Sequence, residues 1–236
     1  MEKEKRLQFV FLTLTCISVI VIVLLGLAIN FYPGGHWQDY SAEGFNLLYN
    51  PVSDLGRTTA YNGESNTISF ALYASALTMM AIIVLGFYSL IWKYFQKKRS
   101  TKWLSIFGSL CGIVQFVLYL GIAFSPADTR ITAHLKFVFS GPAFLFTAIL
   151  CYTIVFFIEK DFPRLNAYSY LAMVVVTILL LTAVIVGTIY GQPLFSMTRR
   201  GGHTIFIFIV TFVYGLQGIG AYLYEKKRAL IQQALQ

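Results

Sequence analysis

Six long apolar stretches constrain this chain more than any other feature of its sequence. Each one exceeds the roughly 20 apolar residues that an α-helix needs to cross a bilayer core about 30 Å thick. With 57% hydrophobic and only 12% charged residues, the chain is too apolar for a soluble domain. The sequence predicts an all-α, polytopic membrane helical bundle. This is a single domain over residues 1–236 with six transmembrane helices, at about 8–31, 67–92, 103–124, 133–158, 167–190 and 203–224.

The basic residues predict how these helices are oriented. Of the 18 Lys and Arg residues, 13 lie in the amino terminus, 93–102, 159–166 and the carboxyl tail. Because cytoplasmic loops carry the excess of Lys and Arg, these segments and both termini are expected to be cytoplasmic, and the other three connections form the outer side. The net charge of +8 reflects this asymmetry and gives no reason to expect a nucleic-acid partner. We expect a multi-pass protein of the cell membrane.

The first outer segment, residues 32–66, is too long to lack structure inside a compact domain. Ser41 can cap a short helix that runs to Tyr49, since serine is a favoured N-cap residue and Pro51 would end the helix. Trp37 and Tyr40 are residue types that favour the membrane interface. The segment is therefore expected to contain a short interfacial helix that lies on the bundle.

All three histidines, His36, His134 and His203, lie on the outer side, together with 5 of the 10 acidic residues. His134 and His203 fall at the start of predicted spans, where a buried polar group costs free energy unless it has a partner. Three interpretations are open. The histidines could bind Zn²⁺ with Asp54 or Asp128, although no local HxxxH or HExxH spacing exists. One could act as a general acid or base paired with an aspartate, or they could form structural hydrogen bonds at helix ends.

The string Asn50-Pro51-Val52-Ser53-Asp54-Leu55-Gly56-Arg57 is the most distinctive local sequence. Pro51 and Gly56 constrain its backbone, and the side chains of Ser53 and Asp54 can bond to nearby amides. These features predict a rigid turn that bears an aspartate. The turn would either plug the outer end of the bundle, through a contact of Asp54 with Arg57 or a histidine, or hold a base or a metal ligand.

The segment Arg199-Arg200-Gly201-Gly202-His203 precedes the sixth span. Two guanidinium groups beside the positive end of a helix dipole, with glycines that allow close approach of the backbone, suit an anion such as a lipid headgroup. The alternative is ordinary anchoring of arginine at the membrane interface. Arg199 and Arg200 are thus candidate substrate-binding residues.

Three motifs follow one another along the outer side: Tyr32-Pro33-Gly34 after the first span, the Asn50 to Gly56 string before the second, and Pro126-x-Asp128 followed by His134. This arrangement resembles a family of six-helix prokaryotic membrane proteins, grouped as domain of unknown function 998, which is distantly similar to the Frag, DRAM and Sfk membrane proteins of eukaryotes. The resemblance implies the six-helix fold and marks Asp54, Asp128 and His134 as positions of interest. It implies no activity, because the family has none assigned.

Together these observations predict a protein that binds or modifies a lipid or lipid-linked substrate at an outer polar site, as an interfacial hydrolase or transferase. The predicted catalytic residues are Asp54, Asp128, His134 and His203, and the predicted substrate-binding residues are Arg57, Arg199 and Arg200. Zn²⁺ is the metal considered, and the expected partners are membrane lipid and a second membrane protein or another copy of the chain.

Two alternative functions remain open. One is a non-enzymatic partner or stability factor for another membrane protein, whose outer loop docks that protein. The other is a small-solute transporter, which is disfavoured because no clear acidic residue lies deep within a predicted span.

Overall fold

The computed structural model describes residues 2–190 and 193–235, and it describes the side chains of these residues except 3, 188, 190 and 193–199. The long helices of this part are α1 (Glu2–Asn30), α2 (Thr67–Ile91), α3 (Arg99–Ala123), α4 (Ile131–Ile158), α5 (Arg164–Tyr190) and α6 (Pro193–Ala234). The loop between α1 and α2 contains the strands β1 (Gly34–His36) and β2 (Asp39–Glu43) and the 3-10 turn η1 (Val52–Gly56), and a second 3-10 turn, η2 (Trp92–Tyr94), follows α2.

Each of these six helices is long and apolar enough to cross a membrane, which confirms the predicted number of spans. Their outward faces carry large apolar side chains, for example Phe9, Phe139 and Ile189, which are 72%, 75% and 69% exposed. Soluble monomers rarely expose contiguous apolar surface of this extent, whereas lipid covers it at no cost. The chain is therefore a multi-pass membrane protein.

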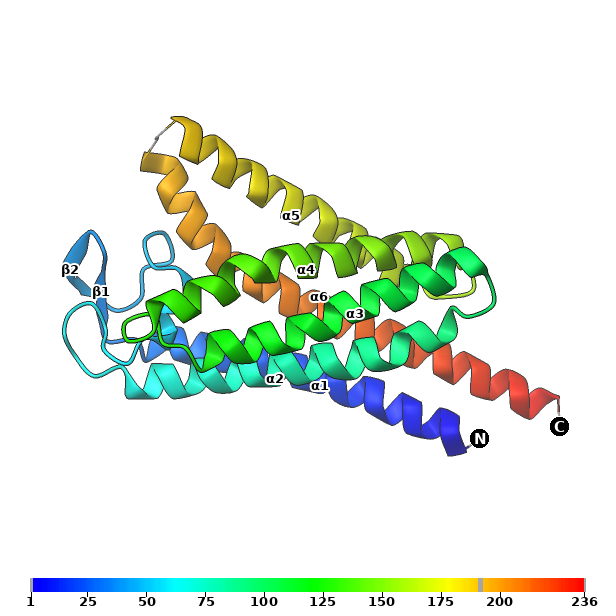
Figure 1. Ribbon diagram of the computed structural model, residues 1–236. Helices are drawn as coiled ribbons and strands as arrows, with labels where there is room; N and C mark the ends of the chain where they lie inside the picture. Colours follow the sequence, from blue (N-terminus) through cyan, green and yellow to red (C-terminus); the bar gives the residue numbers. More distant parts are fainter. Residues whose placement is uncertain (1, 191–192, 236) are drawn as a thin grey trace.

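Both chain ends lie at one end of the bundle, together with the connections α2–α3 and α4–α5 (Figure 1). We call this the terminal end, and we call the opposite end, which carries residues 32–66 and 124–130, the loop end. The side of the membrane that each end faces stays a prediction from the basic residues.

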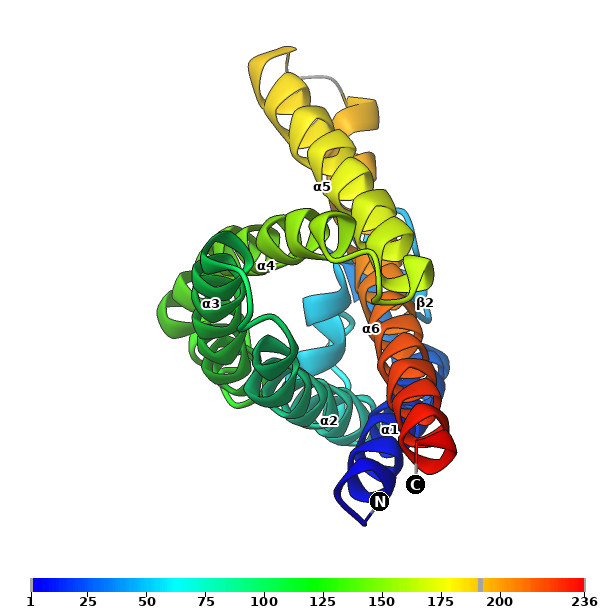
Figure 2. The same ribbon diagram turned by 90° about the vertical axis from the view of Figure 1, so that its right-hand side faces the viewer.

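The helices form a ring in sequence order. Each helix packs against the next, and α6 closes the ring against α1. Figure 2 shows the ring end-on, with α5 and the first turns of α6 projecting from it as an arm. At the loop end this arm leans away from α4, so that α4 and α6 diverge there (Figure 1).

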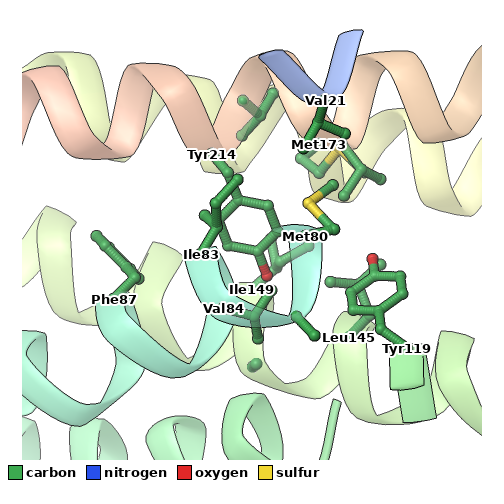
Figure 3. Close-up of a cluster of buried hydrophobic side chains, with 14 of the residues drawn as sticks. Val21, Met80, Ile83, Val84, Phe87, Tyr119, Leu145, Ile149, Met173 and Tyr214 are labelled. Atoms are coloured by element: carbon green, nitrogen blue, oxygen red, sulfur yellow. The ribbon is translucent and has the colours of Figure 1, made fainter. Parts of the chain in front are cut away.

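A cluster of buried hydrophobic side chains, which includes Phe87 and Tyr214, fills the middle of the ring (Figure 3). The Phe87 ring packs edge-on against the rings of Tyr88, Tyr170 and Tyr214, at centroid distances of 5.3, 6.5 and 6.4 Å. The Tyr88 hydroxyl lies 3.1 Å from the Tyr170 hydroxyl and accepts a hydrogen bond from that of Tyr214 at 3.3 Å. A buried hydroxyl needs a polar partner. The hydrogen bonds among these three hydroxyls provide one for each tyrosine and thereby link α2, α5 and α6.

The helix predicted from Ser41 to Tyr49 is wrong, because this segment contains the strand β2 and a turn. β2 pairs antiparallel with β1, and Gly44 has a φ of +62°, which a helix does not accommodate. Asp39 Oδ1 accepts hydrogen bonds from the Ser41 amide at 2.9 Å and its hydroxyl at 2.6 Å. Local bonds of this type compete with a helix, so Ser41 belongs to a strand and not to an N-cap.

The predicted outer loop 191–202 is also largely wrong, since α6 begins at Pro193 and continues through Arg200. Proline at the first helical position is favoured because its missing amide has no partner there in any case. Gly201 lies within the helix, where an added Cβ would collide with the carbonyl oxygen of Leu47. Glycine at position 201 therefore allows α6 to approach the loop closely. It does not end the helix.

We expect Gly112→Ala to destabilise the bundle. A Cβ at Gly112 of α3 would collide with the ring of Tyr88 on α2, which is fully buried and has no room to move. Overpacking of this type costs about 1 to 3 kcal/mol, and it should appear as a lower unfolding temperature in detergent. Gly26→Ala is the matched control, because nothing lies within 4 Å of its added Cβ. Equal unfolding temperatures for the two variants would contradict the packing of α2 on α3.

Candidate functional site

The side chain of Asn50 joins three segments of the loop end. Its Nδ2 donates hydrogen bonds to the Gly35 carbonyl at 3.1 Å and to Asp54 Oδ2 at 2.9 Å, and its Oδ1 accepts one from the Asn46 amide at 2.9 Å. The Asn50 carbonyl also accepts a hydrogen bond from the Thr204 hydroxyl of α6 at 3.3 Å. Since Asn50 is fully buried, this clamp joins the hairpin, the following turn, η1 and α6 without competition from water.

η1 closes the ring at the loop end, where Figure 2 shows it as a light-blue turn enclosed by the helices. Leu55 is fully buried, and its carbonyl accepts hydrogen bonds from Asn66 Nδ2 at 3.0 Å and Ser69 Oγ at 3.4 Å. Gly56 lies against α2, because an added Cβ would approach Tyr73 Cε1 to 2.6 Å. The rigid turn predicted from the 50–57 string is thus present, as a 3-10 turn that plugs the ring.

Asp54 is a carboxyl group buried inside this plug. It is 3% exposed and accepts the hydrogen bond from Asn50. Burial raises its pKa from 3.8 to about 6, although the Asn50 amide and the nearby charges of Arg57 and Arg200 act in the opposite direction. A group that titrates near neutral pH in a closed site is typical of functional positions, and it also occurs in structural networks.

The two arginines near Asp54 lie over aromatic rings. The Arg57 guanidinium carbon is 4.0 Å from the centre of the Tyr61 ring, and that of Arg200 is 4.4 Å from the centre of the Trp37 ring. Each pair is a cation–π contact. These contacts fix the arginines over the hairpin and the following loop.

The basis of the predicted anion site at Arg199 and Arg200 is wrong. α6 begins at Pro193, so both residues lie beyond the first turn, whose amides are the ones left free to bind an anion. Arg199 itself lies outside the residues whose side chains the structure describes. Arg200 remains near Asp54, as a neighbouring charge.

Asp128 fixes one loop to another. Its carboxylate accepts hydrogen bonds from the Thr58 amide at 2.9 Å, the Thr58 hydroxyl at 2.6 Å and the Thr59 amide at 2.9 Å. Partial burial opposes its ionisation, but these hydrogen bonds together lower its pKa below the usual value. The carboxylate is therefore held by the 57–66 loop, and it does not orient a histidine.

His134 is oriented by a carbonyl group. Its Nδ1 lies 2.7 Å from the Ser125 carbonyl oxygen, which can only accept, so we assign the proton of the neutral ring to Nδ1. The bare Nε2 is buried and has no hydrogen-bond partner within the described part of the chain. His134 therefore has the tautomer and the free lone pair that a general base requires.

The three histidines are not in one cluster. His203 is half-buried on α6 and close enough to His134 to interact with it electrostatically. His36 belongs to the hairpin, where its Nδ1 accepts hydrogen bonds from the amides of Gln38 and Asp39, both at 3.3 Å, and its ring stacks on Tyr49 at 4.8 Å. His36 is thus a structural residue, whereas His134 and His203 lie near one another.

A cavity of about 60 Å³ lies directly beneath η1. Its walls come from η1, α2, α3, α4 and α6, and its lining includes Pro142, an exposed residue of α4. Most of its lining is aliphatic or aromatic. The polar side chains in the lining are Ser53, Tyr73, Gln115, Tyr119 and His203.

Sequence reasoning missed Gln115, which is the most unusual residue of this cavity. It is 3% exposed, and its Oε1 has no hydrogen-bond partner among the described residues. An unsatisfied buried amide oxygen costs free energy, and in a membrane span it is a functional candidate. The available signal was a single amide in the middle of an apolar stretch.

A second buried carboxyl group, Glu225, lies at the terminal end and was also not singled out from the sequence. It is fully buried, bonds to Arg228 at 2.8 Å, and its backbone carbonyl accepts a hydrogen bond from Gln8 of α1 at 3.4 Å. The Arg228 guanidinium carbon is 5.8 Å from the centre of the Tyr94 ring. These contacts hold α1, η2 and α6 together, which is a structural role.

Among the described residues, no group of three or more His, Cys, Asp or Glu side chains could hold a metal ion. Comparisons of the chain with family models, with curated proteins and with solved structures find no match. The resemblance noted from the motifs therefore stays a prediction, and the functional argument depends on the geometry of the loop end.

We expect Asp54→Asn to remove a pH-dependent loss of stability. Because the pKa of Asp54 is raised to about 6, its contribution to stability is complete below the ordinary aspartate pKa of 3.8 and is lost as the pH rises through 6. Asparagine keeps an acceptor for Asn50 and cannot ionise. Between pH 4.5 and 7.5 the variant should gain about 2 kcal/mol relative to the parent, measured by unfolding in detergent. Parallel pH profiles would contradict the burial of Asp54.

We expect Asp128→Ala to release the 57–66 loop. The loss of charge-assisted hydrogen bonds worth about 1.5 to 3 kcal/mol each should accelerate hydrogen exchange at the Thr58 and Thr59 amides by about tenfold or more. Asp39→Ala is the matched control, since Asp39 bonds only to nearby residues of the hairpin. If peptides covering residues 57–66 exchange equally in both variants, Asp128 does not hold this loop.

Proposed function

We propose that the protein binds a membrane amphiphile, a lipid or lipid-linked molecule, in the cavity beneath η1. The observation that carries this proposal is the composition of the cavity lining. Apolar side chains from all five wall elements make up most of it, and η1, α2, α3 and α6 add polar groups. A pocket with an apolar body and a few placed polar groups is the usual form of a small-molecule site.

The position of the cavity supports entry from the bilayer. It lies between α4 and α6 at the loop end, where the two helices diverge because the arm of α5 and α6 leans outward (Figure 1). The lining residues of α4 include Val138 and Leu145 next to the exposed Pro142. In this proposal an apolar chain enters the cavity sideways, between α4 and α6, and does not cross the η1 plug.

The candidate site residues take different parts in this proposal. His203 lines the cavity. His134 is close enough to His203 to interact with it electrostatically, and its buried Nε2 has no hydrogen-bond partner among the described residues. If the bound molecule is also modified, His134 is the general base that the geometry favours, since its tautomer is fixed by the Ser125 carbonyl. Asp54 and Asp128 hold η1 and the 57–66 loop in place above the cavity.

The test uses 16-carbon chains that carry a diazirine near the middle and end in an alcohol, a carboxylate or a phosphocholine, added to the protein in nanodiscs. Irradiation and peptide mapping should label the lipid-facing belt, including Phe139, and in addition the cavity residues Val138, Leu145 and Phe206. Labelling of the belt alone by all three chains would overturn the proposal.

Gly141→Leu should abolish the cavity labelling and leave the belt labelling unchanged. Gly141 lines the cavity, and an added Cβ finds only Gln115 Nε2 at 3.4 Å and Gln115 Oε1 at 3.7 Å, so the backbone tolerates a side chain that then fills the space. Ala143→Leu is the matched control, because Ala143 is exposed on the same helix. If both variants keep the cavity labelling, the labelled site is not this cavity.

A further inference from the structure

The charge of the cavity lining limits which headgroup it can take. Within the part of the chain that the structure describes, no Lys, Arg, Asp or Glu lines the cavity. Arg200 lies over the Trp37 ring, away from the lining. His203 brings an imidazole, which is mostly uncharged at pH 7.4 by its ordinary pKa of about 6.5. A buried headgroup that carries a charge would therefore lack a counter-charge, which costs several kcal/mol.

The buried side chain of Gln115 sets a second requirement, which is that the ligand donates a hydrogen bond. Its buried Oε1 accepts no hydrogen bond, so a bound group that donates one removes an existing penalty. The position opposite is Gly141, where an added Cβ would lie 3.4 Å from Gln115 Nε2. Glycine at position 141 therefore leaves the space beside this amide open.

The remaining polar groups add acceptors and donors. Ser53 and Tyr119 each carry a hydroxyl that can donate or accept, and His203 offers a ring nitrogen. A headgroup that both donates and accepts can satisfy them together with Gln115. A carboxylate or a phosphate only accepts, and it would leave Gln115 Oε1 without a partner.

The volume of the cavity and the charges near it agree with a small, uncharged headgroup. The cavity volume of about 60 Å³ exceeds the roughly 10 to 15 Å³ that one water molecule requires, so a hydroxyl head and the part of the chain next to it fit. Asp54 follows Ser53 in η1, and its pKa of about 6 leaves it charged at pH 7.4. Arg57 and Arg200 lie near Asp54 as its counter-charges, so this group of charges adds no unpaired positive charge that would favour an anion in the cavity.

We infer that the cavity selects an amphiphile with an uncharged hydroxyl head, such as a long-chain alcohol, with Gln115 Oε1 accepting the hydroxyl hydrogen. This inference rests on the proposed function, since it names the chemical class of ligand for the same site. Gln115 is a specificity-determining residue in this account, and Tyr119 adds a second hydrogen bond.

The experiment is competition for cavity labelling by the diazirine alcohol in nanodiscs at pH 7.4. The competitors are unlabelled 16-carbon chains that end in an alcohol, a carboxylate, an amine or a phosphate. We expect the alcohol to compete at least tenfold better than each of the others. An equal or better carboxylate, amine or phosphate overturns the inference.

Variants test the role assigned to Gln115. Gln115→Leu should lower the apparent affinity for the alcohol about tenfold, which corresponds to one hydrogen bond of about 1.4 kcal/mol, and it should not change the affinity for the carboxylate. Tyr119→Phe should lower the apparent affinity for the alcohol by a smaller factor. Val117→Leu is the matched control, since Val117 is 55% exposed on the same helix. An unfolding temperature measured for each variant separates loss of binding from loss of fold.

The outcomes separate the two proposals. If all four chains label or compete equally at the cavity and Gly141→Leu removes the labelling, the amphiphile site stands and the selection of a hydroxyl head is overturned. If no chain labels the cavity, both proposals are overturned. A Gln115→Leu variant that folds and binds the alcohol as the parent does overturns the selection by Gln115.

Discussion

The loop end of this protein depends on the side-chain amide of Asn50. A primary amide offers two donors and one acceptor group, and here they bond to the hairpin, to η1 and to the following turn. The backbone carbonyl of the same residue accepts the Thr204 hydroxyl of α6. Thr204 belongs to a long helix, whereas the side-chain partners lie in the short hairpin, in a turn and in η1. The clamp therefore ties these short segments to the helical ring above the cavity.

The membrane explains why the plug must be so completely bonded. Irregular backbone at the end of an apolar ring is tolerated only where protein or water satisfies its polar groups. In η1 the Leu55 carbonyl is satisfied by Asn66 and Ser69, and the Asp54 carbonyl by the Arg57 amide at 3.1 Å. The same rule makes the bare Oε1 of Gln115 unusual. Asn66 Oδ1 and His134 Nε2 are also buried without a hydrogen-bond partner among the described residues. Of these three residues, Gln115 is the one that lines the cavity.

Much of the fold was predictable, because apolar length alone decides whether a helix can cross a bilayer. The rigid turn around Asp54 was predictable too, since Pro51 and Gly56 restrict the backbone locally. The errors share one cause. Gly201 and Gly202 indicated a loop, yet position 201 lies within a helix and must be glycine because the backbone of Leu47 contacts it closely. Ser41 indicated a cap, yet pairing with β1 places it in a strand. Likewise, no local sequence pattern predicts that Asp128 bonds to Thr58 or that Gln115 lines a cavity, because these contacts join residues far apart in sequence.

The buried carboxyl group of Asp54 links the plug to the cavity. An asparagine at this position would keep an acceptor for Asn50 and would avoid the cost of burying a charge, so hydrogen bonding alone does not require an acid. What the acid adds is a negative potential, present above a pKa of about 6, one residue away from the hydroxyl of Ser53 in the cavity wall. In a medium of low polarity such a potential extends over several ångströms with little screening. Arg57 and Arg200 lie near this carboxylate and offset part of its charge. We propose that the remaining potential weakens the binding of anionic headgroups at the proposed site and leaves the binding of uncharged ones unaffected.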